Sequence, residues 1–75
     1  MSSDQTLKEL ENYIGKSILI RVKGGWSIRG VLLGYDAHMN LVLSDAEEIF
    51  KNEVKKMSGM SVIRGDNIIL VSPSG

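Results

Sequence analysis

The stretch Gly34-Tyr35-Asp36-Ala37-His38-Met39-Asn40-Leu41-Val42-Leu43 (residues 34–43) decides the fold, because two β-type runs meet in it at a short polar loop. Residues 36–40 interrupt the apolar pattern with charged, imidazole and amide side chains. Such residues favour a turn. The apolar runs on either side therefore predict two strands joined by a polar loop.

Two β-type runs precede this loop, over residues 17–23 and 26–35. In the first run, the side chains of Ile18, Ile20 and Val22 alternate with those of Arg21 and Lys23. This period of two predicts a half-buried strand. The intervening Gly24-Gly25 predicts a hairpin with a primed turn. Gly30 and Gly34 lie inside the second run, and we expect them to let that strand curve strongly.

Shorter β-type runs follow the loop. Residues 41–45 predict a strand, and the acidic residues 45–48 either continue it or turn. Residues 49–57 alternate weakly, which favours a strand or two halves around a bend. A turn at 58–59, a strand at 60–63, a tight turn at 64–67 and a buried final strand at 68–71 complete the pattern, which Pro73 ends.

An N-terminal helix is predicted over about residues 4–14. Leu7, Leu10 and Ile14 share one helical face, and Gly15 is a suitable stop. One short helix followed by about five short strands predicts a mostly β fold. The residues favour a helix-capped, strongly bent barrel, either SH3-like or OB-like.

Composition excludes several classes of protein. The 75 residues suit one domain, and the absence of cysteine excludes disulfides and thiolate metal sites. One histidine excludes a multi-histidine zinc site. A domain of this size has a small core, so we expect self-association to stabilise it. Nine basic residues balance nine acidic ones, which argues against indiscriminate coating of nucleic acid.

The sequence contains no pattern typical of a signal peptide or a membrane span, so an intracellular, cytoplasmic protein is expected. The sequence offers few side chains suited to catalysis. His38 is the one imidazole, and the adjacent Glu47 and Glu48 would point to opposite faces of a strand. The glycines match no phosphate-binding motif. We therefore expect no enzyme activity, no cofactor and no metal.

The two turns at 36–40 and 64–67 carry residues suited to a flat polar ligand. The planes of His38 and Arg64 can sandwich a nucleobase, and the Asn40 amide can match the donor and acceptor edge of uracil. Plainer interpretations stay open: His38 as a surface residue, Asn40 as a turn cap and Arg64 as an ion-pair partner of Asp66. Trp26 is either a packing cover or an exposed contact.

Taken together, these residues resemble the Sm and Sm-like (Lsm) family. Ile18 to Ala46 resembles the Sm1 motif, and Val62-Ile63-Arg64-Gly65-Asp66-Asn67-Ile68 (within about 60–72) resembles the Sm2 motif. The resemblance covers nearly the whole chain and implies one Sm-like domain over residues 1–75. It implies a five-stranded, strongly bent antiparallel SH3-like barrel behind an N-terminal helix.

The resemblance also implies a partner and a set of roles. Family members form rings, usually of seven, by pairing the fourth strand of one subunit with the fifth of the next; here these are the 53–57 and 68–71 regions. They bind single-stranded, U-rich RNA around the central pore. By resemblance, His38 and Arg64 stack on the base, Asn40 recognises its edge and Asp66 holds Asn40. Gly65 lets its loop come close and is a candidate N–H donor, while Asp36 supports its own loop.

The chain looks most like an archaeal Sm-like protein that forms a homomeric ring. The implied function is that of a scaffold or chaperone in RNA processing, with contacts to other RNA-processing proteins. Two alternatives stay open. One is a ring that binds proteins and has little RNA affinity; the other is a monomeric SH3-like barrel that binds peptides.

Overall fold

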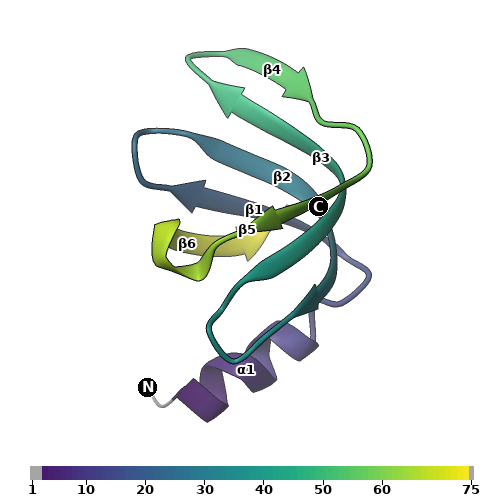
Figure 1. Cartoon of the computed structure of the whole chain (residues 1–75), viewed down its shortest axis with the longest axis vertical. Helices are drawn as coiled ribbons and strands as arrows, with labels where there is room; N and C mark the ends of the chain where they lie inside the picture. Colours follow the sequence, from purple (N-terminus) through teal and green to yellow (C-terminus); the bar gives the residue numbers. More distant parts are fainter. Residues whose placement is uncertain (1–2, 75) are drawn as a thin grey trace.

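The computed structural model describes the backbone of residues 3–74 and the side chains of residues 7–74. Its elements follow the order shown in Figure 1: α1 (Ser3–Glu11), β1 (Ser17–Val22), β2 (Ser27–Tyr35), β3 (Leu41–Phe50), β4 (Glu53–Lys56), β5 (Met60–Ile63), the short 3-10 helix η1 (Gly65–Asn67) and β6 (Ile68–Pro73). The predicted mostly β fold behind an N-terminal helix is confirmed.

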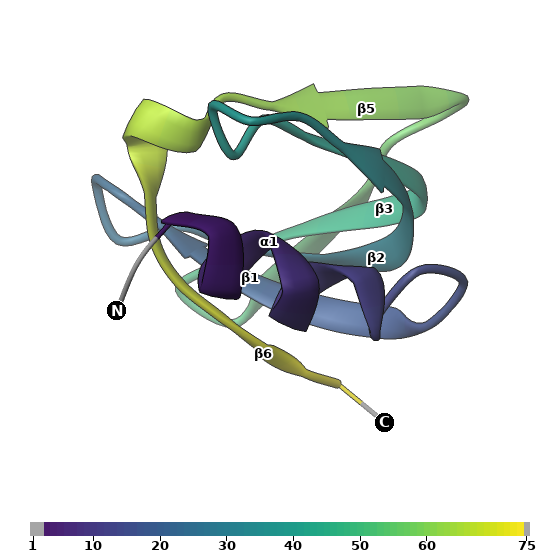
Figure 2. The ribbon, with the colours of Figure 1, turned by 90° about the horizontal axis from the view of Figure 1, so that it is seen from below.

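The helix is shorter than the predicted 4–14. It ends at Glu11, and residues 12–15 form a turn. At the end of this turn, the Gly15 N–H donates to the carbonyl of Leu32 at 2.8 Å, which ties the turn to β2. Figure 1 shows α1 below the curved sheet, and in Figure 2, seen from below, it lies in front of the sheet. The Leu10 side chain of α1 is buried in the core. Within the described residues, no helix is long and apolar enough to cross a membrane.

All strands pair antiparallel in one curved sheet, with the order β4-β3-β2-β1-β6. The long β3 pairs with β5 along its first half and with β4 along its second half. The run predicted over residues 49–57 is therefore divided between β3 and β4. Residues 49–57 cover the end of β3, a turn at 51–52 and β4, as expected for two halves around a bend.

The core lies inside the curve of the sheet. The alternation in β1 is confirmed, since Ile18 and Ile20 are fully buried while Arg21 is exposed. Among the described residues, the buried hydrophobic side chains come from α1 and four of the strands: Leu10, Ile18, Ile20, Ile28, Leu32, Leu41, Leu43, Ala46 and Ile63.

The sheet bends where the β2–β3 register shifts. One shift lies between Arg29 and Val31, at Gly30. A Cβ atom at Gly30 would lie 3.2 Å from the Ala46 Cα and 3.2 Å from the carbonyl oxygen of Ser44. This spacing is tighter than nine in ten real Cβ contacts, so glycine at residue 30 lets the two strands approach this closely. The predicted curvature of β2 is thereby explained.

The two open edges of the sheet differ. On one side lie β4 and β5, which expose Val54, Met60 and Val62; on the other lies β6, which exposes Ile69 and Leu70. The predicted burial of residues 68–71 is wrong for the single chain. Ile69 is skipped in the β1–β6 register, so this bulge breaks the alternation and both Ile69 and Leu70 face out.

Candidate functional site

Two loops far apart in the sequence meet at one small cavity of about 520 Å³. One is the loop 36–40 between β2 and β3, and the other contains η1, between β5 and β6. The cavity is lined by Met39 and by all five residues predicted for the site: His38, Asn40, Arg64, Gly65 and Asp66.

The carboxylate of Asp36 organises the first loop. Its Oδ1 accepts the backbone N–H of His38 at 2.9 Å and that of Asn40 at 3.0 Å. Its Oδ2 accepts the side-chain amide of Asn40 at 2.9 Å. These bonds, first the Asn40 side chain and then the Asn40 backbone N–H, hold the pKa of Asp36 below its ordinary value of 3.8. Asp36 is therefore a charged acceptor that fixes both ends of the loop.

Met39 anchors the same loop from inside. Its backbone is in the left-handed region, with φ 65°, which is uncommon for a residue other than glycine. Its side chain is half-buried and packs against the core. The neighbouring His38 is exposed. This backbone twist sends Met39 inward and leaves His38 at the cavity.

Gly65 provides the contact between the two loops. Its backbone N–H donates to Asn40 Oδ1 at 2.8 Å. A Cβ at this position would collide with the carbonyl oxygen of His38 and would lie 2.9 Å from the carbonyl carbon of Met39. The prediction that Gly65 allows a close backbone approach is confirmed, and its N–H bonds to Asn40.

These contacts fix the orientation of the Asn40 amide. A flipped amide would place its NH₂ against the Gly65 N–H and its oxygen against the Asp36 carboxylate, so two bonds would become two repulsions. An amide oxygen accepts two hydrogen bonds and an amide nitrogen donates two. One acceptor position and one N–H of Asn40 therefore remain for a ligand, in a fixed order.

Asp66 does not hold Asn40, contrary to the prediction. Its Oδ2 accepts from the Arg64 guanidinium at 3.1 Å, two residues away in the same loop. Asp36 holds Asn40 instead, because the tight 36–40 turn places the two side chains together. The Arg64 and Asp66 side chains are 74% and 62% exposed. An ion pair this exposed contributes at most about 1 kcal/mol, so Arg64 is free to leave it for a ligand.

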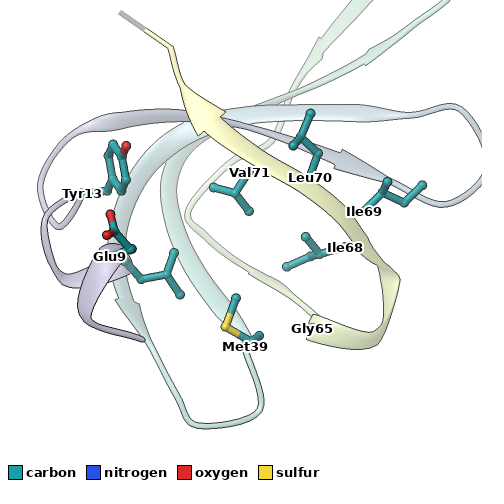
Figure 3. A pocket seen from close by; sticks show the side chains of 9 residues that line it. Glu9, Tyr13, Met39, Gly65, Ile68, Ile69, Leu70 and Val71 are labelled. Carbon is teal, nitrogen blue, oxygen red and sulfur yellow. The ribbon is translucent and has the colours of Figure 1, made fainter. Parts of the chain in front are cut away.

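A larger apolar cavity of about 610 Å³ lies behind Met39 and Gly65, between α1 and β6. Figure 3 shows Ile68 and Val71 on the side of β6 that faces α1, with Ile69 and Leu70 on the other side. The bulge at Ile69 produces this division. The polar and apolar cavities thus share Met39 and Gly65, and β6 joins the site to an open sheet edge.

Comparisons with known proteins agree with this geometry. Residues 8–73 match the LSM domain family. An Sm-like protein of Methanococcoides burtonii is 47% identical, over 93% of this chain and 97% of that protein. The Pyrococcus abyssi Sm protein, solved in complex with a uridine heptamer, has a TM-score of 0.84 and 46% identity, and the match covers 91% of this chain and 96% of that one.

A heptameric archaeal Sm protein has a TM-score of 0.84 and 41% identity, with coverage of 91% of this chain and 98% of that one. The matched family region takes in α1 from Lys8, every strand and both loops of the cavity. The chain therefore belongs to the LSM family of Sm-like proteins.

Proposed function

We propose that this protein is a non-catalytic subunit of a homomeric seven-membered ring that binds single-stranded, U-rich RNA around its central pore. One observation carries the proposal. The Asn40 amide is held in one orientation by Asp36 and Gly65, at a cavity that His38 and Arg64 also line.

The free positions of Asn40 suit uracil. Uracil presents an N–H donor beside carbonyl acceptors, so the Asn40 oxygen accepts from the base while its remaining N–H donates to it. Cytosine presents an acceptor nitrogen beside an amino donor, which needs the opposite order. Turning the amide to suit cytosine would break the bonds to Asp36 and Gly65. Preference for uracil thus follows from the locked amide.

His38 and Arg64 supply the stacking surfaces. The two side chains come from different loops and line the same cavity, and an imidazole and a guanidinium can each lie against the face of a base. Stacking is worth about 1–3 kcal/mol per base and does not depend on base identity. Arg64 and His38 therefore contribute affinity, whereas Asn40 contributes discrimination.

The sheet edges support assembly into a ring. Val62 on β5 and Leu70 on β6 are 66% and 54% exposed, and they lie on opposite open edges. Because Val62 lies on β5, we pair β5 of one copy with β6 of the next in place of the predicted 53–57 region, and this pairing would cover both side chains. The heptameric archaeal relative and the relative with a uridine heptamer support seven copies and a U-rich ligand. A ring of equal sites raises the affinity through effective concentration.

Such a ring acts on RNA by holding it. Each site fixes one base, and repetition around the ring would keep a short segment single-stranded and presented. This property supports a scaffold or chaperone role in RNA processing, with other RNA-processing proteins as further partners.

Binding of labelled U7 and C7 at two salt concentrations tests the proposal, with the assembly mass measured on the same sample. We expect about 58 kDa, seven times the 8.3 kDa chain, and a preference for U7 that persists at the higher salt. Phosphate contacts weaken with salt, whereas stacking and edge bonds are less affected. A ring that binds neither oligonucleotide would favour a protein-interaction role, and a monomer would contradict the assembly.

A further inference from the structure

An exposed tryptophan and a half-buried phenylalanine form a stacked pair outside the site described above. Trp26 lies just after the turn that joins β1 and β2, and Phe50 ends β3. Their ring centroids are 4.3 Å apart and their planes differ by 16°. Trp26 is still 40% exposed. We infer that Trp26, with Phe50 and Lys51, stacks a further nucleobase of the bound RNA without regard to its identity, an inference that rests on the proposed function.

The pair does not serve the core. Neither ring belongs to the core cluster or to the half-buried side chains packed against it. The stack is instead held by the hairpin tips. A Cβ on Gly24 would lie 3.5 Å from Trp26 Cδ1, and one on Gly25 would lie 3.6 Å from Phe50 Cε2, so the turn backbone runs close beside both rings. A flat aromatic surface of this kind loses little freedom when a base stacks on it.

The charges beside the pair suit a nucleic acid. Lys51 Nζ lies 5.4 Å from the centroid of the Phe50 ring, and Lys23 belongs to the same turn as the two glycines. Single-strand binding sites combine such aromatic stacking with cations that contact the backbone phosphates. Glu53 pairs with Phe50 across the β3–β4 hairpin, so we place the phosphate contacts at Lys23 and Lys51 rather than along β4.

The turn is directly connected to the uracil site. The Lys23 N–H donates to the carbonyl of Asn67 at 3.0 Å, and Asn67 ends the η1 helix that begins at Gly65. A cavity of about 430 Å³ is lined by Lys23, Arg64 and Asn67, among others. In Figure 1 the β3–β4 tip, the β1–β2 turn, η1 and the 36–40 loop follow one another down one side of the molecule. An RNA strand that leaves the uracil site can therefore reach Trp26 without crossing the barrel.

The test uses the full-length ring and four RNAs: U7, U7 extended by five adenines at the 3′ end, the same extension at the 5′ end, and U7 extended by five abasic ribose phosphates. Trp26 is the one tryptophan of the chain, so its fluorescence reports contact at this position directly. We expect an adenine extension on at least one end to quench the emission and to raise the affinity over U7 by roughly 5-fold or more. The abasic extension supplies phosphates without bases, so both the quenching of Trp26 and the gain in affinity over U7 should be smaller than with adenines.

Three variants identify the surface that causes the gain. Trp26→Ala should remove the gain from the adenine extension and leave U7 affinity unchanged, while Trp26→Phe should retain most of the gain. Ile14→Ala, an exposed apolar position after α1 that is 43% exposed, is the matched control and should behave as the unaltered chain.

The outcomes separate this inference from the proposed function. If U7 binds but adenines add no affinity and do not quench Trp26, the stacking inference is wrong and the proposed function stands. An equal gain from the abasic extension would also overturn it, since the contact would then be to phosphate. If U7 does not bind while the adenine RNAs quench Trp26, the stacking inference is supported and the proposed uracil site is wrong.

Discussion

The amide oxygen of Asn40 accepts a hydrogen bond from the backbone N–H of Gly65 at 2.8 Å, across 25 residues of sequence. This bond joins the loop after β2 to the loop before β6. Its partner bond to Asp36 lies within the first loop. The orientation of the side chain proposed to recognise the base therefore depends on both loops together, and either loop can disturb it.

Asn40→Ala should abolish the preference for uridine. The variant lacks both groups that match the uracil edge, and a matched pair of such bonds discriminates by about 1–3 kcal/mol. We expect the ratio of U7 to C7 affinity to fall by roughly 5- to 100-fold, measured by fluorescence anisotropy at constant salt.

Arg64→Ala is the matched comparison for that experiment. It removes a stacking plane and leaves the amide in place, so U7 and C7 should weaken together while their ratio stays. An Asn40→Ala ring that still prefers U7 would show that the base edge is recognised elsewhere.

Gly65→Ala should damage the site without altering any side chain that contacts the base. The added Cβ has no space against the His38 carbonyl and the Met39 backbone, so the loops must separate and the bond to Asn40 lengthens. We expect a loss of about 1–3 kcal/mol in the free energy of unfolding and a reduced preference for U7. Gly59→Ala is a useful control, because a Cβ there meets nothing within 4 Å although its φ of 74° adds some strain. An unchanged uridine preference in Gly65→Ala would refute the locking role.

Acid should unlock the 36–40 loop. The pKa of Asp36 is lowered in the folded chain from its ordinary value of 3.8, chiefly by the side-chain bond from Asn40. The stabilisation that follows is complete above the unfolded pKa and is lost as the pH falls through the lower folded pKa. The difference in unfolding free energy between the unaltered chain and Asp36→Asn should thus be constant above about pH 5 and shrink below 3.8. Urea unfolding at one fixed protein concentration measures it, and a difference that grows in acid would contradict the assignment.

Val62→Asp should produce a monomer. Val62 is 66% exposed in the single chain, so the carboxylate is tolerated there, but burial at a strand-to-strand contact would leave it unpaired. The measurement is sedimentation, with Leu33→Asp as control. Leu33 is 45% exposed and lies on β2, whose two sides are already paired with β1 and β3. A Val62→Asp protein that keeps the full assembly mass would exclude β5 from the contact.

Much of the fold follows from local patterns. The alternation of Ile18 and Ile20 with Arg21 determines which face of β1 is buried, and this face was predictable from period alone. The exposure of Ile69 and Leu70 was not. It depends on a bulge against Arg21 and Val22, which is a property of the pairing between β1 and β6 and leaves no local trace in an apolar run.

The site, like the fold, was predictable in part from local sequence and depended for the rest on tertiary contacts. The residue types indicated two loops suited to a flat polar ligand, and the resemblance to the Sm family implied one site made of His38, Asn40, Arg64, Gly65 and Asp66. All five line the cavity. The partner of Asn40 was predicted wrongly, as Asp66 instead of Asp36. An aspartate four residues before an asparagine in a tight turn was the available signal. The stack of Trp26 on Phe50 joins two hairpin tips that only the β2–β3 register brings together.

The register shift at Gly30 bears on the size of the proposed assembly. Because β5 and β6 are different surfaces of one chain, the proposed contact between them would be head-to-tail, and a head-to-tail contact generates either a closed ring or an endless filament. The angle between the two edges would decide which one forms, and we expect the close approach of Gly30 to Ala46 to help set that angle. On this proposal, copy number would be encoded in the curvature of one strand rather than in the contact itself. A side chain at position 30 that flattens the sheet would convert a finite particle into a fibre.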